Sequence, residues 1–202
     1  MNATEFKTAF ETRFYAATTV NSLGWTDNEI SEFLNYGLNS LVIATAESGD
    51  LEAVSNLVKS GELTVSTTPN NERRYAANIS GFYYLISAEL VAPSGTYPME
   101  KIKQDEIVNF KVTPYNAAIF RKPKIAVDDS LGNNYPTFVV LQGGLVPGTP
   151  TKMLYRILVK PTAIDISGNI GTNVTEILHD KIVDIAVAKA VETYLKTQQS
   201  SQ

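Results

Sequence analysis

The spacing of hydrophobic residues changes twice along the chain, and this limits the possible folds more than any other feature. Near the N-terminus, Phe6, Phe10 and Phe14 recur at the helical interval. We expect Ala17 to continue the same buried stripe. Between residues 62 and 166 the helical spacing is lost, and β-favouring runs alternate with Pro and Gly. Helical spacing then returns before the C-terminus. The pattern therefore predicts an α+β protein in which helices from both ends of the chain form a small bundle around an inserted β-rich module.

Local signals set the expected helix boundaries. The first helix is expected at residues 3–18, because Asn2 and Glu5 have the spacing of a capped helix start. Thr26 and Glu29 form a capping-box pattern at the start of a second helix. Its inward stripe is Ile30, Phe33, Leu34, Leu38, Leu41 and Val42. A third, shorter helix is expected between Asp50 and Gly61, with Leu51, Val54, Leu57 and Val58 inward.

The last helix is expected over residues 175–196, with a length of roughly 33 Å at ~1.5 Å per residue. Its inward candidates are Leu178, Ile182, Ile185, Ala186, Val191, Tyr194 and Leu195. We therefore expect three parts: N-terminal helices over 1–61, a β-rich insertion over 62–166, and a C-terminal helix with a polar tail over 167–202.

Five strands are expected within the insertion, at residues 63–67, 82–91, 124–127, 137–141 and 153–159. Residues 128–134, rich in Asp, Asn and Gly, read as a long hairpin turn between two of them. Residues 100–109 fit either a short helix or an ordered loop.

The charge balance argues against a dedicated nucleic-acid-binding domain. The chain has 17 Lys and Arg against 21 Asp and Glu, a formal charge of −4 and a pI near 5.1. Phosphate neutralisation normally needs a basic surplus or stripe. The one local basic run is Arg121-Lys122-Pro123-Lys124, which is too short to line a groove.

Several other classes are excluded by residue content. The chain has no cysteine, so disulfides, thiolate metal sites and cysteine nucleophiles are ruled out. The N-terminus lacks a signal-peptide pattern, and no apolar run approaches the ~20 residues of a membrane span. We expect the protein to be made and folded in a cytoplasm.

Catalytic patterns are weak. The single histidine, His179, falls within the expected C-terminal helix and is interpreted as a surface or subunit-contact residue. Asp105-Glu106 and Asp128-Asp129 are neighbours in sequence, so neither pair can flank a substrate as glycosidase carboxylates do. The second pair fits turn chemistry. Gly168 to Thr172 matches no phosphate-binding loop and is expected to turn the chain towards the last helix. We expect no cofactor and no metal site.

Three segments together resemble the virion ring proteins of tailed phages. They are the capped helix from Trp25 to Gly37, the run Met153-Leu154-Tyr155-Arg156-Ile157-Leu158-Val159-Lys160-Pro161, and the run Glu176-Ile177-Leu178-His179-Asp180-Lys181-Ile182-Val183 with the Asp-Ile-Ala-Val that follows it. Phe120-Arg121-Lys122-Pro123-Lys124 is also similar to a basic strand entry in such proteins. The closest likeness is to head–tail connector and tail-ring subunits of crAss-like phages.

This resemblance implies a helical adaptor with an inserted β domain, assembled into a closed, commonly dodecameric ring. The ring would lie in the neck or tail of the virion, between portal and tail, and would let DNA pass without specific binding. It implies no cofactor and no catalysis. The partners would be copies of the chain itself, the portal and other neck or tail proteins. The candidate contact residues are Arg121, Lys122 and Lys124, together with Lys181, Asp184, Lys189 and Glu192 on the last helix.

Two alternatives remain open. Tyrosines are frequent in the β region, and Tyr83, Tyr84 and Tyr135 could serve a carbohydrate- or receptor-binding module. An enzyme would need Asp128, Asp129 or His179 to converge with other groups in one cleft.

Overall fold

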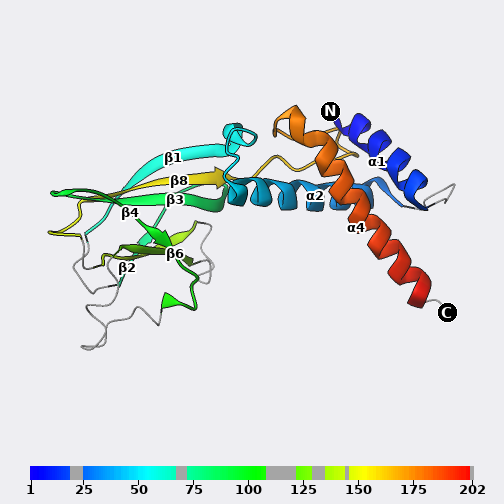
Figure 1. The fold of residues 1–202 in the computed structure, drawn as a ribbon. Helices are drawn as coiled ribbons and strands as arrows, with labels where there is room; N and C mark the ends of the chain where they lie inside the picture. The colour runs from blue at the N-terminus through cyan, green and yellow to red at the C-terminus, as the bar shows by residue number, and fades with distance from the viewer. Residues whose placement is uncertain (19–24, 67–71, 108–121, 129–134, 144–145, 201–202) are drawn as a thin grey trace. The chain divides into compact units, whose positions relative to one another are not determined.

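The chain has the α+β fold class expected from its sequence (Figure 1). The computed structural model describes residues 1–18, 25–66, 72–107, 122–128, 135–143 and 146–200. It divides the chain into two compact units. The helical unit contains Met1–Leu57 and Pro161–Gln202, and the sheet unit contains Val58–Lys160. Both boundaries lie a few residues before the expected ones at 61/62 and 166/167, because a strand begins at Val58 and ends at Val159.

Three α-helices and two short 3₁₀ helices make up the described part of the helical unit. They are α1 (Ala3–Thr18), α2 (Asp27–Ser48), η1 (Ser55–Leu57), η2 (Glu176–Leu178) and α4 (His179–Ser200). The predicted capping box of α2 is present: the Glu29 backbone N–H donates to the Thr26 hydroxyl at 3.3 Å, and the Thr26 N–H donates to the Glu29 carboxylate at 2.7 Å. Gly49 ends α2 in the left-handed conformation, with φ 84°.

Helix α4 packs against both α1 and α2. Phe6, Phe10 and Phe14 of α1 are fully buried, as their spacing predicts. The Trp25 ring lies 4.8 Å from the Phe14 ring, between centroids, and extends this aromatic cluster towards α2. At Gly37, helices α2 and α4 approach so closely that a Cβ added to this glycine would lie 2.4 Å from the Ile182 carbonyl oxygen.

Five expectations about the helical unit differ from the structure. Ala17 is exposed, and Leu195 near the end of α4 is 53% exposed, whereas Phe14 and Tyr194 close to them contact each other, so the buried face ends with those two rings. Residues 50–57 form turns and η1 in place of a third helix. The α4 core also includes residues that the predicted stripe omits: Val183, Val187 and Ala190. The α4 helix itself begins at His179, after the turn of 3₁₀ helix, and not at residue 175.

The sheet unit consists of two four-stranded sheets. One has the order β1-β8-β3-β4 and the other β2-β7-β6-β5. The strands are β1 (Val58–Thr64), β2 (Glu72–Ala76), β3 (Phe82–Ala92), β4 (Gly95–Pro98), β5 (Glu100–Lys101), β6 (Lys124–Asp128), β7 (Thr137–Leu141) and β8 (Lys152–Val159). All pairs are antiparallel except β5 with β6.

The two sheets pack face to face around one apolar core. Leu90 and Met153 of the first sheet meet Phe138 and Val140 of the second, and all four are buried. On the other face of β7, Val139 packs with Ala126 and Ile107, so this strand is buried on both faces. Continuous burial of this kind explains why β7 reads as an unbroken apolar run.

The strand predictions hold best where the run is apolar. The expected strand at 137–141 coincides with β7, and those at 82–91, 124–127 and 153–159 each lie within a residue or so of the observed bounds. Strand β1 begins at Val58, earlier than the expected 63, because its pairing with β8 starts there. Strands β2, β4 and β5 were not expected, since β2 is rich in Arg and β4 in Gly and Pro. Within 100–107 the structure has β5 followed by turns.

No α-helix among the described residues is both long and apolar enough to cross a membrane.

Candidate contact surfaces

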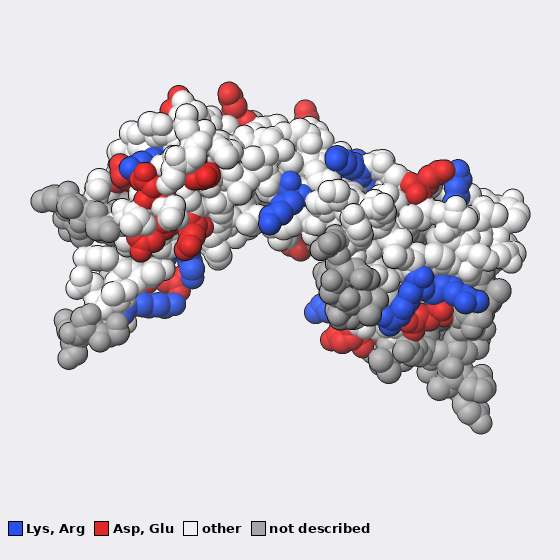
Figure 2. Space-filling model, turned by 180° about the vertical axis from the view of Figure 1, so that it is seen from behind, with Lys and Arg blue, Asp and Glu red and all other residues white. Residues whose placement is uncertain are grey.

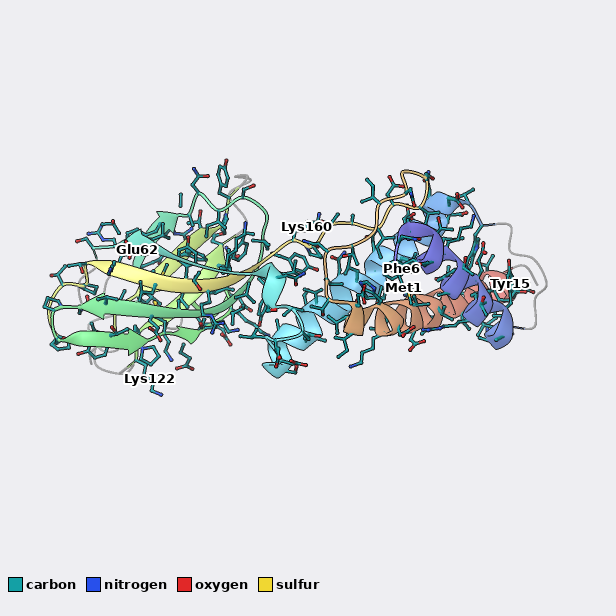
Figure 3. All side chains as sticks on the ribbon, turned by 90° about the horizontal axis from the view of Figure 1, so that it is seen from above. Met1, Phe6, Tyr15, Glu62, Lys122 and Lys160 are labelled. Carbon is teal, nitrogen blue, oxygen red and sulfur yellow. The ribbon has the colours of Figure 1, made fainter. Side chains whose placement is uncertain are left out.

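The three basic candidates before and within β6 have different environments. Lys122 is exposed and projects away from the sheet unit (Figure 3). Lys124 is buried, and its ammonium forms an ion pair with Glu100 on β5. This corrects its interpretation as a surface contact: parallel pairing of β5 with β6 places Glu100 directly opposite Lys124, and the pair joins the two strands. Arg121 lies outside the described residues.

The four candidates on α4 lie on its solvent side, but three of them, Asp184, Lys189 and Glu192, already have partners within the helical unit. Lys181 and Asp184 are exposed. Glu192 accepts hydrogen bonds from Lys196 and from Lys189, the latter at 3.0 Å, and these contacts lower the pKa of Glu192 to about 2. The Lys189 ammonium also lies 5.5 Å from the centre of the Tyr36 ring on α2. Lys189 is therefore part of a local network, whereas Lys181 has no carboxylate partner among the described residues.

Asp184 has a role within the helical unit that the sequence did not reveal. The Arg13 guanidinium on α1 forms ion pairs with Asp184 at 2.7 Å and with Asp180 at 2.5 Å. It also donates to the Asp180 backbone carbonyl at 2.9 Å. One arginine fork therefore joins α1 to the first turns of α4. Such fork geometry orients a helix pair even where a surface ion pair adds little stability.

His179 is buried, which corrects its interpretation as a surface histidine. One ring nitrogen, Nδ1, lies 2.7 Å from the Met1 amino group, and the other lies 3.3 Å from the Val174 carbonyl oxygen. Its ring packs 5.1 Å from that of Phe6, which Figure 3 shows beside Met1. Burial, together with the Met1 ammonium, lowers the pKa of His179. The neutral imidazole therefore anchors the chain start against α4.

Asp128 also departs from its expected role in a turn. It is the last residue of β6 and is buried. Its carboxylate accepts from Arg74 of β2 at 2.5 Å and from the Gln104 amide at 2.7 Å. Asp128 therefore joins strand β6 to β2 and to the segment after β5. Asp129 and the rest of the expected turn, 129–134, lie outside the described residues.

The tyrosines of the carbohydrate alternative differ in exposure. Tyr135 is 43% exposed, whereas Tyr83 and Tyr84 are half-buried. Burial raises the pKa of Tyr83. The Tyr84 hydroxyl accepts from Lys101 at 3.0 Å, and the same ammonium lies 4.7 Å from the Tyr84 ring centre. Tyr84 thus holds a lysine in place on the neighbouring β5.

The helical unit carries a groove that the sequence patterns did not indicate. It has a volume of about 610 Å³ and lies between the turn after α2 and the start of α4. Its lining includes Asp50, Glu52, Ala53, Thr175, Ile177 and Lys181. Two hydrogen bonds hold its walls together: the Thr175 hydroxyl donates to the Ala53 carbonyl at 2.6 Å, and the Asn56 amide donates to the Asn173 carbonyl.

Ile177 stands out within this groove, because it is 77% exposed. Its neighbour Leu178 is buried, so the single turn of η2 directs one large apolar side chain inward and the other outward. The signal that could have located the groove is the local excess of unpaired acids in the sequence, at Glu47, Asp50, Glu52 and Glu176.

The two units carry opposite formal charge. The helical unit has 5 Lys and Arg against 13 Asp and Glu, which gives −8; the sheet unit has 12 against 8, which gives +4. Together these make the −4 of the whole chain. On the face drawn in Figure 2, acidic side chains gather over the helical unit, and the longest run of basic side chains lies over the sheet unit.

Among the described residues, no group of three or more His, Cys, Asp and Glu side chains is arranged to hold a metal ion. The chain matches no model of a known protein family, and no protein with a curated description matches it.

Proposed function

We propose that this protein is a structural subunit that forms a ring in the head–tail connector of a tailed phage. In that role it would join the portal to the tail and surround the path of the DNA. Its partners are copies of itself, in a ring that we take to be dodecameric, and the portal or other neck and tail proteins. The subunit acts by assembling and carries out no reaction.

The observation that carries this proposal is the division of one chain into two compact units with separate cores. The helical unit is closed by segments from both chain ends, and the sheet unit is inserted between them. A closed ring uses head-to-tail contacts, so each subunit must present two different, complementary faces. Two units with different surfaces and opposite charge offer such faces. The likeness of the three sequence segments to phage ring proteins supports the same role.

The internal pairing of functional-looking side chains also favours an assembly role. The two enzyme candidates that the structure describes are occupied in structural contacts: Asp128 with Arg74 and Gln104, and His179 with the Met1 amino group. These contacts join strands or helices to one another. The exposed groups that remain are distributed over the surface, which suits contact with other proteins.

The test is the native mass of the protein and its location in a particle. We expect mass spectrometry under native conditions, or electron microscopy, to show closed rings of many copies. In purified virions, labelling should place the protein in the neck or tail. A protein that is monomeric at high concentration and absent from particles would contradict the proposal. Binding to a glycan array, lost on changing Tyr135, would then support the carbohydrate alternative.

A further inference from the structure

When the charges that form ion pairs within each unit are left out of the count, the helical unit keeps a surplus of negative charge and the sheet unit a surplus of positive charge. In the described part of the helical unit, Lys7, Arg13, Lys189 and Lys196 are each paired with a carboxylate. Acids without a cation partner there include Glu32, Glu47, Asp50, Glu52 and Glu176, and all five are exposed. The unit therefore keeps its negative surplus on its surface, where it is available to a partner.

The sheet unit shows the reverse. Most of its described carboxylates are taken up internally: Glu62 by Lys152, Glu72 and Asp128 by Arg74, and Glu100 by Lys124. Exposed cations without a carboxylate partner in the described sheet unit include Lys59, Arg73, Lys101, Lys103, Lys122, Arg156 and Lys160. The positive surplus is therefore also on the surface.

Three of these cations lie together at one sheet edge. Strand β5 is the edge strand of its sheet and carries Lys101, with Lys103 just after it. Lys122 precedes β6, the strand paired with β5, and lowers the pKa of Glu100 together with Lys124, the larger influence. We call Lys101, Lys103 and Lys122 the basic edge. Lysines on an edge strand discourage strand addition, but they leave the edge open to acidic side chains.

We propose that the groove of the helical unit, with Asp50 and Glu52 on its wall and Ile177 at its rim, receives the basic edge of a second copy of this chain. This inference rests on the proposed ring function and names the contact between neighbouring copies. The groove supplies two unpaired carboxylates and a 77% exposed isoleucine, beside one cation, Lys181. The edge supplies the ammonium groups of Lys103 and Lys122, while that of Lys101 already donates to the Tyr84 hydroxyl and the Leu85 carbonyl. An apolar anchor surrounded by complementary charge is the usual composition of a protein contact.

A second copy is the favoured occupant because both halves of the contact belong to the same chain. Every copy then carries one groove and one basic edge, so the contact can repeat from copy to copy and close on itself. The two carboxylates of the groove outnumber its one lysine, so the opposite net charges of the two faces also disfavour groove-to-groove and edge-to-edge association.

Charge reversal on one face at a time tests the proposal. The groove variant is Asp50→Lys with Glu52→Lys, and the edge variant is Lys103→Glu with Lys122→Glu. No side-chain hydrogen bond or ion pair within the described chain uses Asp50, Glu52 or Lys122, and Lys103 contributes only its backbone N–H. Both variants should therefore fold. Matched controls reverse the same number of charges elsewhere on each unit: Glu32→Lys with Glu47→Lys, and Lys59→Glu with Arg156→Glu.

Each variant alone should lose self-association, by about tenfold or more in the association constant measured by sedimentation equilibrium. Mixing the two should restore it, because the reversed groove of one copy then meets the reversed edge of the other. The controls should assemble as the unchanged chain does. An Ile177→Ser variant should weaken assembly without being rescued by either partner.

Failure of this contact can be told apart from failure of the proposed function. If the unchanged chain forms rings that both variants also form, the contact is wrong and the ring function stands. If the mixture of variants remains monomeric while each variant is folded, the groove and edge do not bind across copies. Binding of the basic edge to a DNA duplex, lost in the edge variant while assembly is unaffected, would assign that edge to nucleic acid and overturn the proposal.

Discussion

The helical and sheet units are stabilised in different ways. The helical unit depends on large aromatic side chains that fit between three helices, and on one position where two backbones touch, at Gly37. The sheet unit depends on strand pairing, on a core shared by two sheets, and on ion pairs between strands, such as that of the exposed Arg74 with the buried Asp128. The helical unit brings the two ends of the chain together, because α4 packs against α1 and α2, whereas the sheet unit combines pairs of successive strands, such as β3 with β4, with more distant pairs, such as β1 with β8.

The single tryptophan makes the comparison measurable. Trp25 is the only Trp in the chain, and its ring packs with Phe10, Phe14 and Phe33 of the helical unit. Its fluorescence therefore reports on the helical unit. Circular dichroism reports on both units together. The two signals can show whether a substitution affects one unit or the whole chain.

The largest effects are expected from truncating one buried phenylalanine in each unit. Phe10→Ala and Phe138→Ala both remove fully buried rings and should each lower the free energy of unfolding by about 3–5 kcal/mol. If the units unfold separately, Phe10→Ala will lower the midpoint of the Trp25 fluorescence transition and Phe138→Ala will leave it unchanged. Equal shifts in both variants would show that the two units unfold as one.

A smaller effect is expected at the closest helix contact. In Gly37→Ala the new Cβ would meet the Ile182 carbonyl oxygen at 2.4 Å and the Ala186 nitrogen at 3.1 Å. Backbone atoms cannot move aside easily, so we expect the free energy of unfolding to fall by about 1–3 kcal/mol. This net loss already includes the higher helix propensity of Ala, which by itself would stabilise α2.

Gly61→Ala in β1 is the matched comparison in the sheet unit. There the new Cβ meets the Tyr155 hydroxyl, at 2.4 Å, which belongs to a side chain that can rotate away. The free energy of unfolding should therefore fall less in Gly61→Ala than in Gly37→Ala. An Ala44→Ser change on the exposed side of α2 serves as the control for Gly37 and should have almost no effect. An equal loss at Gly61 would show that the sheet unit is packed as rigidly as the helix pair.

The capping box should contribute less than either core contact. Thr26→Ala removes the hydroxyl that accepts from the Glu29 N–H, and we expect a loss of about 1 kcal/mol in thermal or urea unfolding followed by Trp25 fluorescence. Thr26→Ser keeps the hydroxyl and should retain most of the stability. If Thr26→Ala had no effect on Trp25 unfolding, the helix start would not limit the stability of the helical unit.

The smallest effect is a pH dependence confined to the helical unit. The pKa of His179 is lowered in the folded protein from its ordinary value of 6.5, through burial and the Met1 ammonium, although Val174, Glu176 and Asp180 oppose this. Because the unfolded chain binds the proton more readily, the contribution of His179 to stability is fully present above pH 6.5. It is lost as the pH falls through the lower pKa that His179 has in the folded protein.

Unfolding followed by Trp25 fluorescence between pH 7.5 and about pH 5 measures this dependence. A His179→Gln variant keeps a polar side chain at the position and should flatten it. The transition of the sheet unit should be unaffected, since His179 is the only histidine of the chain. If the stability of the helical unit still falls with pH in His179→Gln, the pH dependence comes from carboxylates and not from His179.

The sequence was most informative where one repeat or one local motif decides the structure. The three phenylalanines of the α1 stripe, the capping box at Thr26 and the apolar run of β7 were all correctly located. Prediction was poorest where partners distant in sequence decide the outcome. Residues 58–61 continue a helical pattern in the sequence but form a strand, because β8 supplies hydrogen bonds along its whole length.

The candidate contact residues show the same division. A Lys in a basic run was expected to be exposed, and this is true of Lys122 but not of Lys124, which faces Glu100 across a parallel strand pair. The acidic groove and Ile177 were missed, since they are formed by two segments more than a hundred residues apart. The sign of the groove in the sequence is the local excess of acids at Glu47, Asp50, Glu52 and Glu176.

By itself, the sequence determined the α+β class, the main helices and the longer strands, because side-chain periodicity and capping act over a few residues. The tertiary structure decided which charges remain free. An ion pair is satisfied only when folding brings two distant side chains within a few ångströms, as for Arg13 with Asp184 or Arg74 with Asp128. The surface available to a partner is what remains after that pairing, and it cannot be read from composition alone.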